Sequence, residues 1–109
     1  MIYSNSKADR AKIGKDEQTH KRGLSMLGCM VCRRLHGPHV PGPVELHHLR
    51  TGGWGKGDWI TLMPLCVEHH RGQSGVHGLG TRGFAAHYGF DQQDLLGDAL
   101  ALLEKLRAI

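Results

Sequence analysis

The chain has 109 residues, of which 39% are hydrophobic, 6% are aromatic and 16 are glycine. This length leaves room for one hydrophobic core, so we expect a single domain over residues 1–109, with a thin core that a bound metal would help to stabilise. The formal net charge is +4, and the basic excess lies within residues 1–90. Such a balance agrees equally well with a polyanionic partner, most simply nucleic acid, and with a solvated basic surface.

Composition also limits where the protein works. The first ten residues contain no apolar segment typical of an export signal, and no stretch is long and apolar enough to span a membrane. We therefore expect no membrane partner. Three cysteines, two of them close together at Cys29 and Cys32 and one distant at Cys66, argue against a disulfide framework. They favour metal binding in a reducing compartment, and so a cytoplasmic protein.

The N-terminal part predicts a helix. Residues 7–27 are mostly good helix formers, although Gly14 and Gly23 weaken the prediction of one unbroken helix. Residues 1–19 are expected to form a basic arm that frays. This arm either faces DNA or lies in solvent.

A centre rich in glycine and in metal-binding residues follows. Cys29 and Cys32 are expected in a turn, and the run HGPHVPGP indicates a loop. The runs VELHHL and ITLMPLC predict two strands joined through the glycine-rich loop RTGGWGKGDW. The run VEHHRG predicts one or two helical turns that end at Gly72 and Gly75.

Residues 91–109 predict the most regular element, an amphipathic C-terminal helix. Asp91 is expected to cap it, with Asp94 three residues later. Its wide apolar stripe is expected to close the core; dimerisation is the alternative, so the oligomeric state stays open. The stripe consists of Leu95, Leu96, Ala99, Leu100, Leu102, Leu103 and Leu106.

The cysteines have the spacing of a structural zinc site. Cys29 and Cys32 form one close pair of ligands. Cys66 forms the other pair with either His69 or His70, because residues three or four apart share one face of a helix. The spacing alone leaves open which histidine closes the site.

Two pairs of adjacent histidines then need an explanation, His47 with His48 and His69 with His70. Neighbours on a helix point in different directions, and neighbours on a strand point to opposite faces. If one helical and one strand histidine bind a second metal, the other strand histidine is placed to deprotonate a water molecule for attack on a phosphodiester. The pattern favours metal-assisted phosphodiester hydrolysis.

The runs CMVC, ELHHLR, ITLMPLC and VEHHRG, in this order, resemble the HNH, or His-Me finger, endonucleases. With the flanking runs THKRGLSMLGCMVC and GVHGLGTRGFAAHYG, the chain is most similar to the bacteriophage recombination-enhancement nucleases, the Ref-type family that depends on RecA. The resemblance implies an α+β fold, with a small ββα-metal core and a zinc clip between the two terminal helices. It implies a DNA endonuclease or nickase in phage recombination, in the cytoplasm of a bacterial host cell, with a RecA-type recombinase filament as a partner.

The resemblance also implies roles for individual residues. His48 becomes the general base, and the catalytic metal, Mg²⁺ or Zn²⁺, is expected between His47, His70 and His77. His69 joins the cysteines, so the structural zinc set is Cys29, Cys32, Cys66 and His69. Thr61 stands where the family has the asparagine that fixes the base-bearing loop, and a hydroxyl does not offer the separate donor and acceptor of an amide.

Other polar residues are expected around this site. We expect some basic side chains to contact phosphates, the alternative being a solvated rim; these are Arg33, Arg34, Arg50, Lys56, Arg71 and Arg82. His20 is expected to pack or hydrogen-bond at the zinc clip. Trp54 and Trp59 are expected to anchor the core or the glycine loop, the alternative being stacking on bases. The remaining histidines, His36, His39 and His87, are expected in loops or on the surface.

Two other interpretations stay open. One is a catalytically silent zinc-binding module for DNA or RNA, and the other is a protein-interaction domain that uses its C-terminal helix. A plain zinc module needs only one tetrahedral set of ligands. It would therefore leave His48 and the second helical histidine unexplained.

Overall fold

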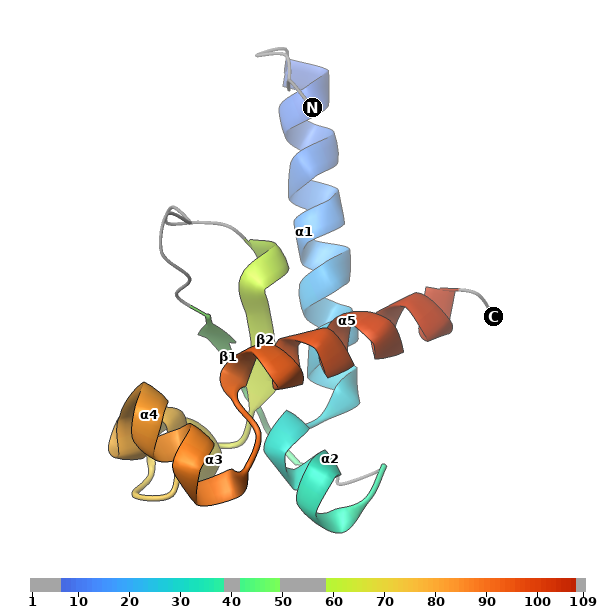
Figure 1. The fold of residues 1–109 in the computed structure, drawn as a ribbon. Coiled ribbons are helices and arrows are strands. Elements are labelled where there is room, and N and C mark those ends of the chain that lie inside the picture. Colours follow the sequence, from blue (N-terminus) through green and yellow to red (C-terminus); the bar gives the residue numbers. More distant parts are fainter. Residues whose placement is uncertain (1–6, 39–41, 50–58, 108–109) are drawn as a thin grey trace.

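The structure is a computed structural model of the chain and describes residues 7–38, 42–49 and 59–107. These residues form an α+β fold in which helices surround a small sheet (Figure 1). The expected fold class is confirmed at this level. In chain order the elements are α1 (Lys7–Leu27), α2 (Met30–His36), β1 (Glu45–His48), the 3₁₀ turn η1 (Trp59–Thr61), β2 (Leu62–Leu65), α3 (Val67–Arg71), α4 (Val76–Tyr88) and α5 (Gln92–Arg107).

The two strands pair antiparallel, with Glu45 opposite Leu65 and His48 opposite Leu62. Every residue of β2 is buried, because α1, α2 and α5 all contact this strand. The two predicted strands are therefore present. The second is shorter than the sequence suggested, since Ile60 and Thr61 belong to η1 and not to the strand.

The long helix α1 extends beyond the other elements, and α5 crosses it near its C-terminal half (Figure 1). The helix α1 continues through Gly14 and Gly23 without a break, although these glycines had weakened the prediction of one unbroken helix. A Cβ on Gly23 would lie 2.7 Å from Cδ2 of Leu103. The missing side chain therefore allows the two helices to approach closely, which compensates for the low helix propensity of glycine.

The capping of α5 is as predicted. The backbone N–H of Asp94 donates to Oδ1 of Asp91 at 2.8 Å, and the N–H of Asp91 donates to Oδ2 of Asp94 at 2.9 Å. This reciprocal pair fixes the first turn of the helix. The buried stripe is narrower than the apolar pattern suggested, because Leu106 is 46% exposed. Its apolar members are Leu95, Ala99 and Leu103.

Two helices differ from the sequence-based expectation. Instead of a turn at the first cysteine pair, α2 starts directly after Cys29, whose Sγ accepts a hydrogen bond from the N–H of Cys32 at 3.5 Å. The helix α4 was not predicted, and it contains three glycines, which have a low helix propensity. It is bent at Gly80, which has a φ of +74° that a residue with a side chain rarely adopts.

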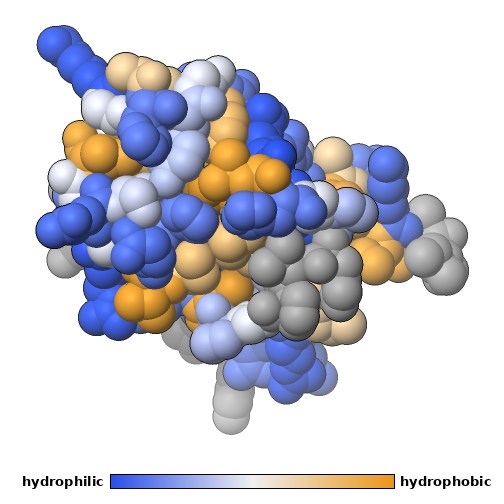
Figure 2. All heavy atoms as spheres, turned by 90° about the horizontal axis from the view of Figure 1, so that it is seen from below, coloured by the Kyte–Doolittle hydropathy of each residue, from blue (hydrophilic) through white to orange (hydrophobic). Residues whose placement is uncertain are grey.

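Seen from below, the molecule presents mostly hydrophilic side chains, and its apolar atoms lie between them in separate groups (Figure 2). The larger apolar side chains that pack together lie inside, around Phe84, Leu24 and Met63. None of the described helices is long and apolar enough to cross a lipid bilayer.

Candidate metal centres

Three cysteines and one histidine converge between α2 and α3. Cys29 and Cys32 lie at the start of α2, and Cys66 and His69 lie at the start of α3. Nδ1 of His69 is 3.2 Å from Sγ of Cys66, 3.4 Å from Sγ of Cys32 and 3.6 Å from Sγ of Cys29. The Sγ atoms of Cys32 and Cys66 are 4.0 Å apart.

These distances fit a tetrahedral zinc site. Zinc binds sulfur at about 2.3 Å and imidazole nitrogen at about 2.0–2.1 Å, which puts a sulfur and a nitrogen ligand about 3.5 Å apart and two sulfurs about 3.8 Å apart. The four donor atoms all lie within 4.8 Å of one another. The prediction that these four residues can hold a metal is confirmed, and the histidine beside the cysteines is His69.

The pKa values of these four residues, which we call the cysteine cluster, describe its metal-free state. Burial, together with the neighbouring thiols Cys29 and Cys66, raises the pKa of Cys32 to about 12. Burial also raises the pKa of Cys29 and lowers that of His69. The metal-free cluster therefore keeps these two thiols protonated and its imidazole neutral at neutral pH, so that zinc must displace the thiol protons.

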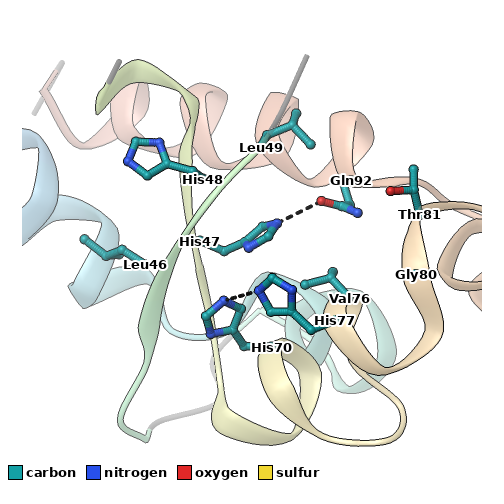
Figure 3. A pocket seen from close by; sticks show the side chains of 10 residues that line it. All are labelled: Leu46, His47, His48, Leu49, His70, Val76, His77, Gly80, Thr81 and Gln92. Carbon is teal, nitrogen blue, oxygen red and sulfur yellow. Dashed lines mark hydrogen bonds between the residues drawn. The ribbon is translucent and has the colours of Figure 1, made fainter. Parts of the chain in front are cut away.

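A second cluster consists of three histidines from three elements, His47 on β1, His70 on α3 and His77 on α4 (Figure 3). Their ligand atoms lie within 4.8 Å of one another. Nε2 of His77 is 3.1 Å from Nε2 of His70, and the ring of His47 lies 5.1 Å from each of the other two, centre to centre.

The donor set of this histidine cluster fits a transition metal. Two imidazole nitrogens bound to one ion at about 2.0–2.1 Å would lie about 2.9 Å apart in octahedral geometry and about 3.4 Å apart in tetrahedral geometry. The 3.1 Å between the two Nε2 atoms falls in this range. Imidazole ligands suit Zn²⁺, whereas Mg²⁺ prefers carboxylates and water. Of the two expected metals, the side chains therefore favour Zn²⁺.

Glu45 fixes the orientation of His70. Nδ1 of His70 is 2.8 Å from Oε1 of Glu45, and Arg71 forms an ion pair with the same carboxylate at 2.7 Å. The hydrogen bond with His70 has the largest effect on the pKa of Glu45 and lowers it. Desolvation raises this pKa by less, and Arg71 lowers it further. If Nδ1–H donates to this carboxylate, Nε2 of His70 stays free to bind a metal.

Sequence reasoning missed this role of Glu45. Glu45 precedes His47 by two residues on the same strand, so both side chains project from one face of the sheet. This spacing of two residues was the sequence signal that Glu45 lies beside the histidine cluster.

Gln92 contacts His47, the histidine on β1. Nε2 of His47 is 2.9 Å from Oε1 of Gln92, and both side chains are buried. Burial lowers the pKa of His47, so the ring is neutral at neutral pH. The sequence offered no signal for this contact, because the two residues are 45 positions apart and Gln92 stands among the ordinary residues of a capped helix.

Two glycines bring His77 to His70. A Cβ on Gly75 would lie 2.6 Å from the carbonyl oxygen of Glu68, and a Cβ on Gly78 would overlap the carbonyl oxygen of Gly72. Only residues without side chains therefore allow the first turn of α4 to pack against the end of α3.

His48 stays outside the histidine cluster. It is exposed, lies across β1 from His47, and lines the same cavity of about 570 Å³ (Figure 3). Its Nδ1 is 3.4 Å from Oγ1 of Thr61, and the carbonyl of Thr61 accepts a hydrogen bond from the N–H of Leu49 at 3.0 Å. Thr61 thus contacts the expected base through its hydroxyl and the base-bearing strand through its backbone.

Three of the arginines expected to contact phosphates have partners within the protein. Arg34 forms an ion pair with Asp98 at 2.7 Å and lies over the ring of Phe90, and Arg33 donates to the carbonyl of Leu27. The third is Arg71, which binds Glu45. Arg82 is exposed on α4. Arg50 and Lys56 lie outside the described residues, so the phosphate contacts stay predictions.

Some of the other aromatic and histidine residues lie in the described part of the chain, and the rest lie outside it. His20 is buried on α1 and packs edge-on against Trp59, with 5.0 Å between the ring centres. His36 and His87 are exposed, as expected. His39 and Trp54 lie outside the described residues.

The two clusters share the short helix α3, which contributes His69 to one and His70 to the other.

Comparisons with protein-family models, with curated proteins and with solved structures found no match to this chain. The assignment of function therefore rests on the geometry of the two clusters and on the sequence motifs.

Proposed function

We propose that the chain is a metal-dependent DNA endonuclease or nickase with an HNH-type active site on a zinc-stabilised scaffold. The observation that carries this proposal is the second cluster, in which three imidazoles converge beside the exposed His48 at an open cavity of about 570 Å³. One closed set of four ligands suffices for a structural zinc. A second set that opens on a cavity is the arrangement that a reaction with a bound substrate needs.

The order of the elements supports the same proposal. β1 carries the histidine pair, β2 returns beside it, and α3 follows with the helical ligand, which is the ββα order of the HNH core. DNA as the substrate, a recombinase filament as a partner and phage recombination as the setting come from the resemblance of the motifs. The net charge of +4 agrees with a polyanionic substrate.

In the proposed reaction the side chains divide the work. A divalent ion held by the three histidines would stabilise the charge on the scissile phosphate and on the leaving oxygen. His70 is oriented by Glu45, and His47 by Gln92. If Nδ1–H of His48 donates to Thr61, Nε2 of His48 would accept a proton from the water whose oxygen forms the new bond to phosphorus as the bond to the leaving oxygen breaks.

Cleavage of supercoiled plasmid tests the proposal. We expect the wild-type protein to nick the plasmid with a divalent metal, and His48→Ala to lose about 10²–10⁴-fold in rate, the usual contribution of a general base. His87→Ala is the matched control, because His87 is exposed and lies outside both clusters. It should cleave like the wild type.

Two outcomes of this assay would contradict the proposal. Equal cleavage by His48→Ala, with its zinc retained, would remove His48 as the base. No cleavage by the wild type with Zn²⁺, Mg²⁺, Mn²⁺ or Ni²⁺, with and without recombinase filaments, would favour the silent zinc-binding module.

A further inference from the structure

We propose that Gln92 is a positioning residue that makes His47 present Nδ1, and not Nε2, to the metal ion. This inference rests on the metal site of the proposed function and deepens it. It assigns a role in the active site to the C-terminal helix, which the sequence suggested only as a cover for the core.

The hydrogen bond between the two side chains carries the inference. Nε2 of His47 lies 2.9 Å from Oε1 of Gln92, and the two residues are only 9% and 8% exposed. A neutral imidazole has one N–H, so a proton held on Nε2 leaves the lone pair on Nδ1. Because the contact is buried, water cannot easily replace the amide oxygen as the acceptor.

The placement of the ring agrees with this division. His47 lies between Gln92 on one side and the pair His70 and His77 on the other (Figure 3). His70 has the opposite arrangement, because its Nδ1 faces Glu45 and its Nε2 faces His77. An ion in the cluster would then be bound through Nδ1 of His47 and through Nε2 of His70 and His77, with Gln92 orienting the first ring and Glu45 the second.

The position of Gln92 on α5 shows that packing alone does not explain why a glutamine stands there. Gln92 lies on the buried stripe of the helix, at the spacing of Leu95, Ala99 and Leu103. An apolar side chain would fill this position in an ordinary core helix. Leu95 is fully buried, and the reciprocal hydrogen bonds of Asp91 and Asp94 fix the first turn, so α5 holds the amide in place against His47.

The test compares four proteins that each carry one zinc in the cysteine cluster: wild type, Gln92→Leu, Gln92→Glu and Gln93→Ala. Gln92→Leu removes the acceptor and suits the apolar stripe, Gln92→Glu keeps an acceptor oxygen, and Gln93 is an exposed neighbour on the same helix. Nitrogen-15 NMR of the imidazoles reports which nitrogen of His47 carries the proton. Calorimetric titration with Zn²⁺ then measures the affinity of the histidine cluster.

We expect the Nε2–H form of His47 in the wild type, in Gln92→Glu and in Gln93→Ala, and a mixture of the two forms in Gln92→Leu. The affinity of the histidine cluster for Zn²⁺ should fall about 10–100-fold in Gln92→Leu, as is usual when the partner of a ligating histidine is lost, and stay near the wild-type value in Gln93→Ala. Gln92→Glu should retain most of the affinity.

Two results would overturn the role of Gln92 while leaving the proposed function intact. They are an Nδ1–H form of His47 in the metal-free histidine cluster of the wild type, and an unchanged Zn²⁺ affinity in Gln92→Leu. Failure of the proposed metal site looks different, because then all four proteins would bind only the first zinc. That result would overturn both proposals.

Discussion

At the scale of single residues, the two histidines of each adjacent pair lie in different surroundings. His69 faces the cysteines and His70 faces the cavity, because successive residues on a helix differ by about 100° in direction. His47 is buried in the histidine cluster and His48 is exposed beside it, because successive residues on a strand point to opposite faces. The pair on α3 therefore contributes to two clusters, whereas the pair on β1 contributes one residue to the histidine cluster and one to the rim of the same cavity.

Zinc binding at the cysteine cluster should weaken as the pH falls. The raised pKa values of Cys29 and of Cys32, the latter about 12, mean that both thiols are protonated in the metal-free protein at neutral pH. A zinc ion must displace their protons, so lower pH favours the free thiols over the complex and binding releases about one proton per thiol. Calorimetry in buffers with different heats of ionisation, from mildly acidic to mildly basic pH, measures both quantities. A Zn²⁺ affinity that does not change with pH would contradict this picture of the cluster.

At the scale of elements, the junction of α3 and α4 sets the geometry of the histidine cluster. The first turn of α4 rests on the end of α3 through Gly75 and Gly78, and this contact places His77 against His70. The bend at Gly80 then turns the rest of α4 toward the core, where Phe84 is fully buried. Gly75 and Gly78 therefore position the imidazole of His77 in the histidine cluster.

Gly78→Ala should remove the second metal site and keep the first. The added methyl group would overlap the carbonyl oxygen of Gly72, a backbone atom that cannot move aside cheaply, so α4 must shift and carry His77 away from His70. We expect a loss of about 1–3 kcal/mol in the free energy of unfolding, an unchanged structural zinc, and weak or absent binding of a second Zn²⁺.

Gly83→Ala is the matched control for this change. Its Cβ would meet only Cβ of Leu79 at 3.5 Å, an ordinary contact, so the gain in helix propensity of up to about 1 kcal/mol should dominate. Metal analysis and urea unfolding of both variants check the expectation. Normal binding of a second Zn²⁺ by Gly78→Ala would show that the glycine contact does not set the site.

Elements defined by local pattern could be predicted from the sequence, and those defined by contacts could not. The capped helix after Asp91 and the two strands follow from propensity and periodicity, and the three cysteines of the cysteine cluster follow from their spacing, which left His69 and His70 as alternatives for the fourth residue. The helix α4 was not predicted, and tertiary packing stabilises it in spite of its three glycines. The contact of His47 with Gln92 depends on how α5 folds back over the sheet, which no local pattern contains.

At the scale of the whole molecule, the two clusters connect parts of the chain that the small core alone would hold weakly. The cysteine cluster joins α2 to α3, and Cys32 and Cys66 are 34 positions apart. The histidine cluster joins β1, α3 and α4, and Gln92 adds α5. The fold measures 45 × 34 × 20 Å, and α1 extends away from the end that carries the two clusters (Figure 1). A metal in the first cluster would therefore stabilise the scaffold, while a metal in the second would serve the reaction.

Plasmid cleavage measured against metal content tests this division most directly. Protein with one zinc per chain, verified by native mass spectrometry, is titrated with further Zn²⁺ and assayed on supercoiled DNA at each step. We predict a folded but inactive protein at one zinc per chain, and nicking that rises in parallel with occupancy of the histidine cluster and levels off at two. Full cleavage at one zinc per chain, or none at two, would contradict the account.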